Sequence, residues 1–389
     1  MTLTDPVCLT QALIRYPSVT PLDAGALGFV DTTLSKLGFD VHRMTFRDAD
    51  TPDIDNIYAR LGTSGPNLCF AGHTDVVPPG DAASWSAQPF NAEIRDGILF
   101  GRGAVDMKGA IACFIAAVAR VLKDNTQVLP RGSISFLITG DEEGPAINGT
   151  TKVLDWLSQR GEALDACLVG EPSNPSAIGD AIKIGRRGSI NGDLIVHGRQ
   201  GHAAYPVLAD NPIPKLATLL SALTAEPLDA GTDSFQPSSL EPTIISVPNT
   251  ATNVIPAHAR AIFNVRYNDL WSRERIEAHL RSVCEKAAVE LGTSFDLTFT
   301  GSGSVFLTKP GPLVDTLSSA IVDVTGRAPT LSTGGGTSDA RFIKDACPVV
   351  EFGLVNATIH KVDEHVAVAD LEVLTKVYAA FISRFLATA

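Results

Sequence analysis

The sequence predicts an α/β protein with a mixed sheet flanked by helices, interrupted by an inserted α+β domain. Apolar runs alternate with helical patterns up to residue 186, and this alternation returns after residue 301. The stretch between them reads as alternating strands and two helices. A chain of 389 residues exceeds what one core usually organises. We therefore expect one domain from residues 1–186 and 301–389, with residues 187–300 as the insert.

The expected elements follow from their apolar periodicity. Residues 8–37 form a helical region interrupted near Pro17 and Pro21, because proline ends helices. The first part then contains strands at 68–71, 133–138 and 166–169 and helices at 109–122 and 150–160. The insert contains strands at 189–196 and 260–266 and helices at 212–223 and 273–291. The last part contains a helix at 311–325, a glycine turn at 334–336, a strand at 348–354 and a helix at 369–387.

Composition excludes several classes of protein. The net charge of −12 argues against nucleic acid or an anionic membrane as the main partner. The six cysteines form no C-x-x-C pair, which favours reduced thiols. The first six residues lack the features of a signal peptide, and the apolar stretch at 110–119 is too short to span a bilayer. We expect a cytoplasmic protein.

An acidic turn at residues 139–144 directly follows the apolar run at 134–138. It contains Glu142 and Glu143 side by side. Two carboxylates at the end of a buried strand repel each other unless a cation or a shared proton is present. One of them could bind a metal while the other carries a proton. By itself, the turn is better explained as a solvated acidic loop.

Similar groups follow other apolar runs. His73 and Asp75 follow the run at 68–71, Glu171 follows 166–169, and His360 comes after 348–354. Ligands gather beyond the carboxyl ends of strands in α/β sheets, so these groups are expected to meet. Imidazole with carboxylates suits catalytic zinc. Each residue has an ordinary structural alternative, but their joint placement favours a metal site.

Two further features refine this hypothesis. Asp106 lies just before the helix at 109–122 and could point into the same space. Asp75 lies two residues after His73, so on an extended segment its carboxylate could accept a hydrogen bond from His73 and fix its tautomer. The sequence has no H-E-x-x-H, G-x-S-x-G or G-x-x-x-x-G-K-[ST] motif. The glycine-rich turn at 333–337 could bind an anion with its backbone amides.

Taken together, these motifs resemble those of the di-zinc aminoacylase/carboxypeptidase amidohydrolase family. The resemblance spans nearly the whole chain. Its first four motifs specify the chemistry of the family, and the later ones indicate the acyl group. The matching segments are residues 72–78, 101–108, 140–144, 170–173, 185–189, 200–206, 253–256, 336–339 and 356–361.

The resemblance implies a ligand set for two zinc ions per chain, with cobalt as a plausible substitute. Asp106 would bridge the two ions. His73 and Glu171 would complete the site of one ion, and Glu143 and His360 that of the other.

The resemblance also implies catalytic roles outside the ligand set. Asp75 would orient His73. Glu142 would be the general base that takes a proton from the attacking water and later delivers one to the leaving amine. The insert would be a dimerisation and lid domain of a homodimer, and its His202 would stabilise the oxyanion in the partner chain's site.

The implied activity is hydrolysis of N-succinyl-L,L-diaminopimelate to succinate and L,L-diaminopimelate, in lysine and diaminopimelate biosynthesis. Two arginines suit a substrate with several carboxylates. The expected substrate-binding residues are Arg186, Ser189, Arg266, Gly336, Thr337 and Asn356. An acetylornithine deacetylase, or a related N-acyl amino-acid deacylase or dipeptidase, would share every metal ligand. A non-enzymatic binding module is the alternative from a different class.

Overall fold

The computed structural model describes residues 2–124 and 131–387, and the chain divides into two compact units. The first unit comprises Met1–Ile184, Thr308–Ser332 and Ser338–Ala389. The second comprises Gly185–Leu307 and Thr333–Thr337. The glycine-rich turn at 333–337, which the sequence assigned to the returning α/β part, thus belongs with the second unit.

The first unit is built on an eight-stranded sheet in the order β1-β2-β6-β3-β7-β18-β8-β17. The four strands from β6 to β18 run parallel, whereas β1 and β2 pair antiparallel. This confirms the predicted mixed sheet. The strands are β1 (Asp40–Phe46), β2 (Ile54–Leu61), β3 (Asn67–His73), β6 (Ser133–Thr139), β7 (Ala166–Val169), β8 (Ala181–Lys183), β17 (Thr330–Ser332) and β18 (Val349–Glu351).

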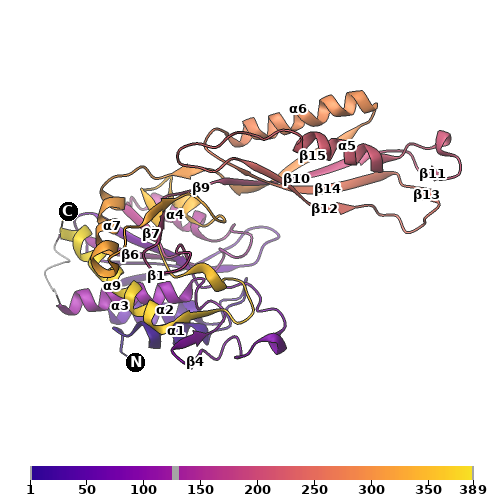
Figure 1. The fold of residues 1–389 in the computed structure, drawn as a ribbon. Coiled ribbons are helices and arrows are strands. Elements are labelled where there is room, and N and C mark those ends of the chain that lie inside the picture. The colour runs from indigo at the N-terminus through magenta and orange to yellow at the C-terminus, as the bar shows by residue number, and fades with distance from the viewer. Residues whose placement is uncertain (1, 125–130, 388–389) are drawn as a thin grey trace. The chain divides into compact units, whose positions relative to one another are not determined.

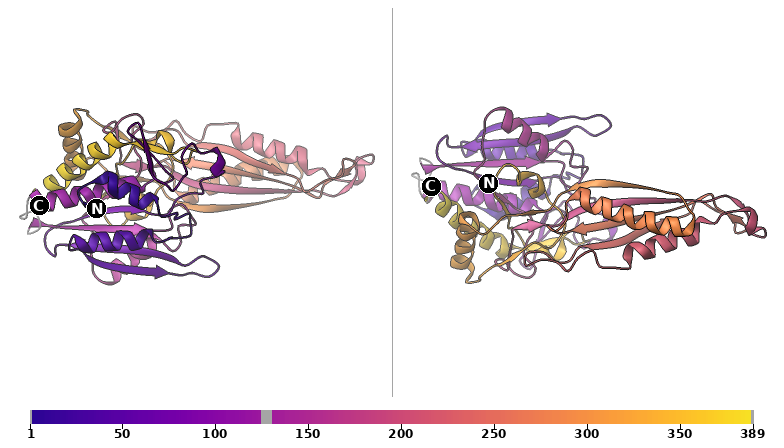
Figure 2. Two further views of the ribbon diagram at one scale, coloured as in Figure 1. Left: turned by 90° about the horizontal axis from the view of Figure 1, so that it is seen from below. Right: turned by 90° about the horizontal axis from the view of Figure 1, so that it is seen from above.

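Helices cover this sheet on both faces. Every residue of β3 and β6 is therefore buried. Helices α1, α3, α7 and α9 pack together as one group (Figure 1). Helix α4 packs on α8. Figure 2 shows the indigo α1 beside the magenta α3. The helices are α1 (Pro6–Ile14), α2 (Ala26–Lys36), α3 (Lys108–Asp124), α4 (Thr150–Gln159), α7 (Pro312–Thr325), α8 (Ala340–Ile343) and α9 (Val368–Ala387).

An aromatic cluster joins the sheet to these helices. Phe70 of β3 stacks on Phe114 of α3 with ring centroids 4.3 Å apart, and Tyr378 of α9 lies edge-on to both. All three side chains are fully buried, which makes their hydrophobic contribution large. The cluster holds α3 against the sheet, and thereby fixes the loop that enters α3.

The four central strands end at one edge of the sheet, because they run parallel. β3 ends at His73, β6 at Thr139 and β7 at Val169. The chain leaves β18 at Glu351, three residues earlier than the predicted strand end. A small sheet of β4 (Glu93–Arg95), β5 (Ile98–Phe100) and β19 (His365–Ala367) lies in the same unit. Its β19 follows the loop that carries His360.

The second unit has a four-stranded antiparallel sheet in the order β12-β14-β10-β15, with α5 and α6 packed on one face (Figure 1). Burial alternates along β10 and β14, as expected for a sheet with one covered face. The elements of this unit are β9 (Gly185–Arg186), β10 (Gly188–His197), β11 (Gly201–His202), α5 (Pro212–Thr224), β12 (Ser239–Ser246), β13 (Val254–Ile255), β14 (His258–Tyr267), α6 (Arg273–Leu291), β15 (Phe295–Gly303) and β16 (Phe306–Leu307).

The sequence anticipated β10, β14 and both helices of this unit but missed the two edge strands β12 and β15. Pro242 lies inside β12, and proline argues against a central strand. The structure resolves the conflict by placing β12 at the edge, with an irregular register between Pro242 and Ile244. Within the described ranges, no helix is both long and apolar enough to cross a membrane.

Candidate metal centre

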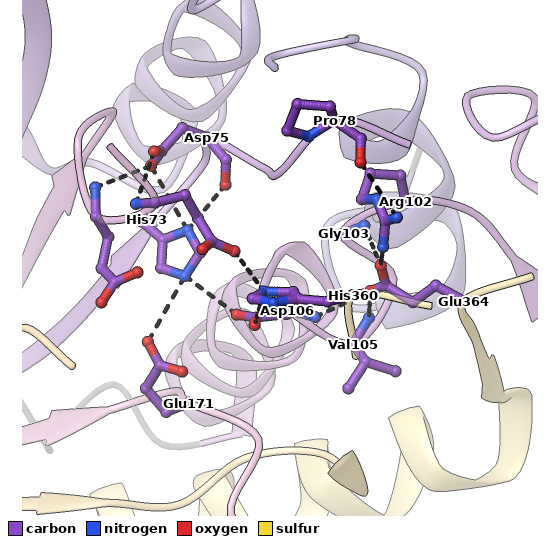
Figure 3. Close-up of polar contacts among 12 residues, drawn as sticks. His73, Asp75, Pro78, Arg102, Gly103, Val105, Asp106, Glu171, His360 and Glu364 are labelled. Carbon is purple, nitrogen blue, oxygen red and sulfur yellow. Dashed lines mark hydrogen bonds and ion pairs between the residues drawn. The ribbon is translucent and has the colours of Figure 1, made fainter. Parts of the chain in front are cut away.

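His73 ends the buried strand β3 and presents its Nε2 atom to two carboxylates. Its Nδ1 lies 2.9 Å from the main-chain carbonyl oxygen of Asp75. A carbonyl oxygen only accepts, so Nδ1 carries the proton and Nε2 is the atom left for a metal. Nε2 lies 3.2 Å from Asp106 Oδ1 and 3.6 Å from Glu171 Oε1 (Figure 3).

The Asp75 carboxylate has a different partner from the one predicted. Its Oδ1 lies 3.6 Å from His73 Nδ1, beyond hydrogen-bond length, because the chain turns so that the Asp75 carbonyl reaches the imidazole instead. The carboxylate accepts backbone N–H bonds from Glu142 at 3.3 Å and Glu143 at 3.0 Å. Burial raises the pKa of Asp75 to about 6. Asp75 therefore ties the end of β3 to the acidic turn after β6.

Asp106 lies between two imidazoles and presents a different oxygen to each. Oδ1 is 3.2 Å from His73 Nε2, and Oδ2 is 3.2 Å from His360 Nε2 (Figure 3). Burial would raise the pKa of Asp106, but the neighbouring imidazoles of His360 and His73 outweigh it and hold this pKa well below its usual range. The arrangement is that of a carboxylate able to bridge two cations.

Two groups of possible ligands share Asp106. One consists of His73, Asp106 and Glu171, and the other of Asp106, Glu143 and His360. Within each group the ligand atoms lie within 4.8 Å of one another. In the second group, His360 Nε2 is 2.9 Å from Glu143 Oε1. The structure thus brings together all five predicted ligands, from five separate segments of the chain.

The electrostatics of this cluster suit a cation. Burial and the nearby Asp106 raise the pKa of Glu171 to about 7. Burial and Glu171 raise the pKa of Glu142 well above its usual value. Hydrogen bonds to Asp106 and Glu143 raise the pKa of His360 to about 10. Crowded carboxylates repel one another, and a cation bound among them would relieve this repulsion. The nitrogen and oxygen donors fit zinc.

The acidic turn divides its three carboxylates between two tasks. Asp141 is buried and accepts backbone N–H bonds from Ala146, Ile147 and Asn148. It shapes the loop. Glu142 and Glu143 face the cluster, and both lie within reach of His73.

The predicted substrate-binding residues fall in both units. Asn356 lies in the first unit, at the start of the short helix η4 (Asn356–Thr358). Arg186 of β9 is buried in the second unit and donates from Nη1 to Gly334 O at 3.1 Å. Gly335 has φ of 104°, and a Cβ there would lie 2.4 Å from Arg186 Nη1, so the turn needs glycine. Gly336 faces open space, and Thr337 is half-buried.

A second polar group in this unit contains Ser189 and Arg266, which are paired in register across β10 and β14. Asn264 joins them, donating to Ser189 Oγ at 3.4 Å and accepting from Arg266 Nε at 3.0 Å. Burial, and then the charge of Arg187, lower the pKa of Arg266. The sequence pattern did not single out Asn264 or Arg187. For Asn264 the available indication was its place two residues before Arg266 on β14, on the same side of the strand.

His202 lies on β11 in the second unit and is exposed. Its Nδ1 accepts a hydrogen bond from the Ala204 backbone N–H at 3.0 Å. An N–H group only donates, so the neutral ring carries its proton on Nε2. His202 therefore offers an N–H donor to a ligand.

Comparison with known proteins identifies the family. The sequence model of "Peptidase family M20/M25/M40" matches residues 69–384. The chain belongs to this family.

Full-length relatives agree with this membership. A protein from Rhodospirillum centenum named succinyl-diaminopimelate desuccinylase is 59% identical over 385 residues, covering 99% of this chain and 98% of its own. The resemblance predicted from the motifs is confirmed. Among solved structures, aminopeptidase PepT from Bacillus cereus matches with a TM-score of 0.80 at 22% identity, covering 100% of this chain and 99% of its own. The Bacillus subtilis YxeP protein, described as a dinuclear metal-binding peptidase, matches with a TM-score of 0.70 at 16% identity, covering 99% and 98%. Both structures confirm the fold.

Metal binding to the metal-free protein is expected to release protons. The pKa of His360, raised to about 10 beside Asp106 and Glu143, keeps its ring protonated at pH 7, whereas a metal ligand must be neutral. The affinity for zinc should therefore increase as the pH rises from 7 towards 10. Calorimetric titrations at pH 7 in buffers of different ionisation enthalpy measure the released protons. A binding heat that is independent of the buffer would contradict this expectation.

Proposed function

We propose that this chain hydrolyses N-succinyl-L,L-diaminopimelate to succinate and L,L-diaminopimelate, a step in lysine and diaminopimelate biosynthesis. The observation that carries the reaction class is the Asp106 carboxylate shared by two ligand groups, with Glu142 beside them. The substrate follows from the relative that is 59% identical over nearly the full length and bears the desuccinylase name. The six free cysteines suit a reducing compartment, which supports a cytoplasmic location.

The five ligands would hold two zinc ions per chain. His73, Asp106 and Glu171 would hold one ion, and Asp106, Glu143 and His360 the other. Bound zinc would polarise the amide carbonyl and lower the pKa of water at the site. Cobalt accepts the same nitrogen and oxygen donors and would replace zinc.

Glu142 is the proton carrier in this proposal. The Asp75 carboxylate holds the Glu142 backbone N–H and so positions the residue beside His73. Burial and Glu171 raise the pKa of Glu142, so its carboxylate accepts a proton more readily than that of an exposed glutamate. Glu142 takes a proton from the attacking water and delivers it to the nitrogen of the leaving amine. Asp75 serves as the residue that orients His73, through its backbone carbonyl.

Substrate binding is assigned to the two polar groups of the second unit and to Asn356. Arg186, with Gly336 and Thr337 of the adjoining turn, forms one anchor, and Ser189 with Arg266 forms another. Guanidinium groups bind carboxylates through paired hydrogen bonds, and the substrate carries carboxylates at both ends.

We also assign a homodimer to this chain, joined through the second unit. The edge strand β12 is largely exposed, with Ile244 at 51% and Ile245 at 66% exposure. An exposed apolar edge is a template for pairing with a second strand, and a second copy of β12 fits it. His202 would then reach the partner's site and donate from Nε2 to the oxyanion formed there.

Substitution of the two adjacent glutamates separates their roles. Glu142→Gln should retain two zinc ions and lower kcat by about a hundredfold or more, because proton transfer is lost. Glu143→Gln should instead weaken the binding of one zinc ion. Steady-state kinetics and metal analysis of the purified variants measure both effects. Near-normal turnover of Glu142→Gln would exclude Glu142 as the base.

Substrate selectivity tests the acyl group. A site built to pair with a carboxylate leaves its own groups unsatisfied when the carboxylate is absent. The N-acetyl analogue and N-acetylornithine should therefore show kcat/KM values about a hundredfold or more below that of the succinyl substrate. Comparable values would favour the acetylornithine deacetylase alternative and leave the metal centre intact.

The arginine anchors are tested in the same assay. Arg186→Ala and Arg266→Ala should each lower kcat/KM for the succinyl substrate by about tenfold or more without loss of zinc. Arg260→Ala is the matched control, since Arg260 lies on β14 like Arg266 but pairs with Asp193 on the surface. Equal effects of Arg260→Ala and Arg266→Ala would refute a binding role for Arg266.

Mixing two inactive variants tests the dimer. Each mixed dimer of His202→Ala and Glu142→Gln chains would contain one site with an intact Glu142 and an intact His202 from opposite chains. Random exchange should restore about a quarter of the wild-type activity. If subunit exchange is verified and no activity returns, His202 does not act across the dimer.

A further inference from the structure

A buried ion pair between Arg102 and Glu364 holds the loop that carries Asp106. Glu364 is fully buried, and Arg102 is 2% exposed. Glu364 Oε2 accepts from Arg102 Nη1 at 2.7 Å and from the Gly103 backbone N–H at 3.1 Å. Its Oε1 accepts from the backbone N–H groups of Val105 at 2.9 Å and Asp106 at 3.2 Å (Figure 3). One carboxylate therefore holds most of the loop from residue 102 to 106.

The backbone of Glu364 adds to this attachment, because its carbonyl oxygen accepts from the Gly101 N–H at 2.9 Å. Arg102 is fixed in turn by the Pro78 carbonyl oxygen, 3.4 Å from Nη2, and by the Trp85 ring, 5.3 Å from its guanidinium carbon. Neither member of the pair is a predicted ligand or catalytic group.

The energetics of this arrangement favour a fixed geometry. Buried backbone N–H groups without partners are costly, and Glu364 serves three of them in this loop. A buried carboxylate is costly as well, and Arg102 compensates for its charge. Removing either partner leaves the other buried and unpaired, so the pair and the loop hold each other in one conformation.

Glu364 also belongs to the loop that carries His360. In the sequence, His360 lies four residues before Glu364. Asp106 and His360 are the two residues whose side chains meet at 3.2 Å in the second ligand group. Glu364 thus connects, through one side chain, the backbone of the bridging carboxylate with the segment of the opposing imidazole.

We infer that Glu364, supported by Arg102, is a positioning residue that sets the Asp106 carboxylate between His73 and His360. This inference rests on the proposed metal-dependent function. Because Asp106 is shared by both ligand groups, a shift of its backbone weakens both zinc sites. The site of Asp106, Glu143 and His360 is affected more, since two of its three ligands lie on segments that Glu364 connects. Among the described residues, Glu364 belongs to neither ligand group.

The test replaces Glu364 by glutamine, which keeps its shape but removes the charge and one acceptor oxygen. Zinc titration of the metal-free variant against a chromophoric chelator measures both affinities. Loss of partners around metal ligands typically costs about 10–100-fold in metal affinity, so Glu364→Gln should weaken both zinc sites, and the site of Asp106, Glu143 and His360 by about tenfold or more. The kcat of the zinc-saturated variant should fall while KM for the succinyl substrate changes little, because the binding groups are untouched.

Glu372→Gln is the matched control. Glu372 forms a two-point ion pair with Arg120, at 2.8 and 2.7 Å, and a longer one with Lys376. Within residues 2–124 and 131–387 its side chain has no ion pair with the ligand loops. It should leave both zinc affinities unchanged. Thermal unfolding of the metal-free variants separates stability from positioning. Wild-type zinc affinities in Glu364→Gln would overturn the inference, even if that variant unfolds at a lower temperature.

Glu364→Asp keeps the charge but shortens the side chain, and it decides the case if Glu364→Gln does not fold. A carboxylate shorter by one methylene group cannot reach Arg102 and the Asp106 N–H together, so weakened zinc binding is again expected. Wild-type affinity for both ions would overturn the inference. The wild-type protein serves as the separate test of the proposed function. If wild type itself binds fewer than two zinc ions, the proposed function fails, whatever the variants show.

Discussion

The sharing of one carboxylate by two imidazoles is the constraint on which the site depends. Asp106 places one oxygen 3.2 Å from His73 and the other 3.2 Å from His360. This arrangement requires two histidines that come from distant segments of the chain and lie on opposite sides of the Asp106 side chain. The parallel strands supply the first, at the end of β3, and a loop beyond β18 supplies the second. The remaining ligands, Glu143 and Glu171, complete a group on either side.

The surroundings of Asp106 fix this arrangement through the backbone. The Asp75 carboxylate holds the main chain of Glu142 and Glu143, and the Glu364 carboxylate holds the main chain of Asp106. In both cases a buried carboxylate binds the N–H groups of a loop whose own side chains face the site. Backbone bonds of this kind leave the ligand side chains free for a metal while their positions are set.

Much of the site could be predicted because its residues follow apolar runs. Strands buried on both faces have continuous apolar sequences. The end of each apolar run therefore indicates which residues lie at the carboxyl end of the strand. His73, Glu142, Glu143 and Glu171 were located in this way, and the structure places them together. The fold class followed from the same runs.

Other features depended on tertiary contacts that local patterns do not encode. Alternation placed His73 and Asp75 on one side but did not reveal that the Asp75 carbonyl, rather than its carboxylate, meets the imidazole. The edge strand β12 was hidden by Pro242, which only an edge tolerates. The ion pair of Arg102 with Glu364 joins residues far apart in the sequence. Local sequence patterns therefore show each of them only as a charged residue in a loop.

The most direct measurement of this account is anomalous diffraction at the zinc absorption edge from crystals of the zinc-loaded protein. Two peaks are expected, one on either side of the Asp106 carboxylate and roughly 3.5–4 Å apart. The first should be coordinated by His73 and Glu171, and the second by Glu143 and His360. A single peak, or two peaks that do not share Asp106, would contradict the account.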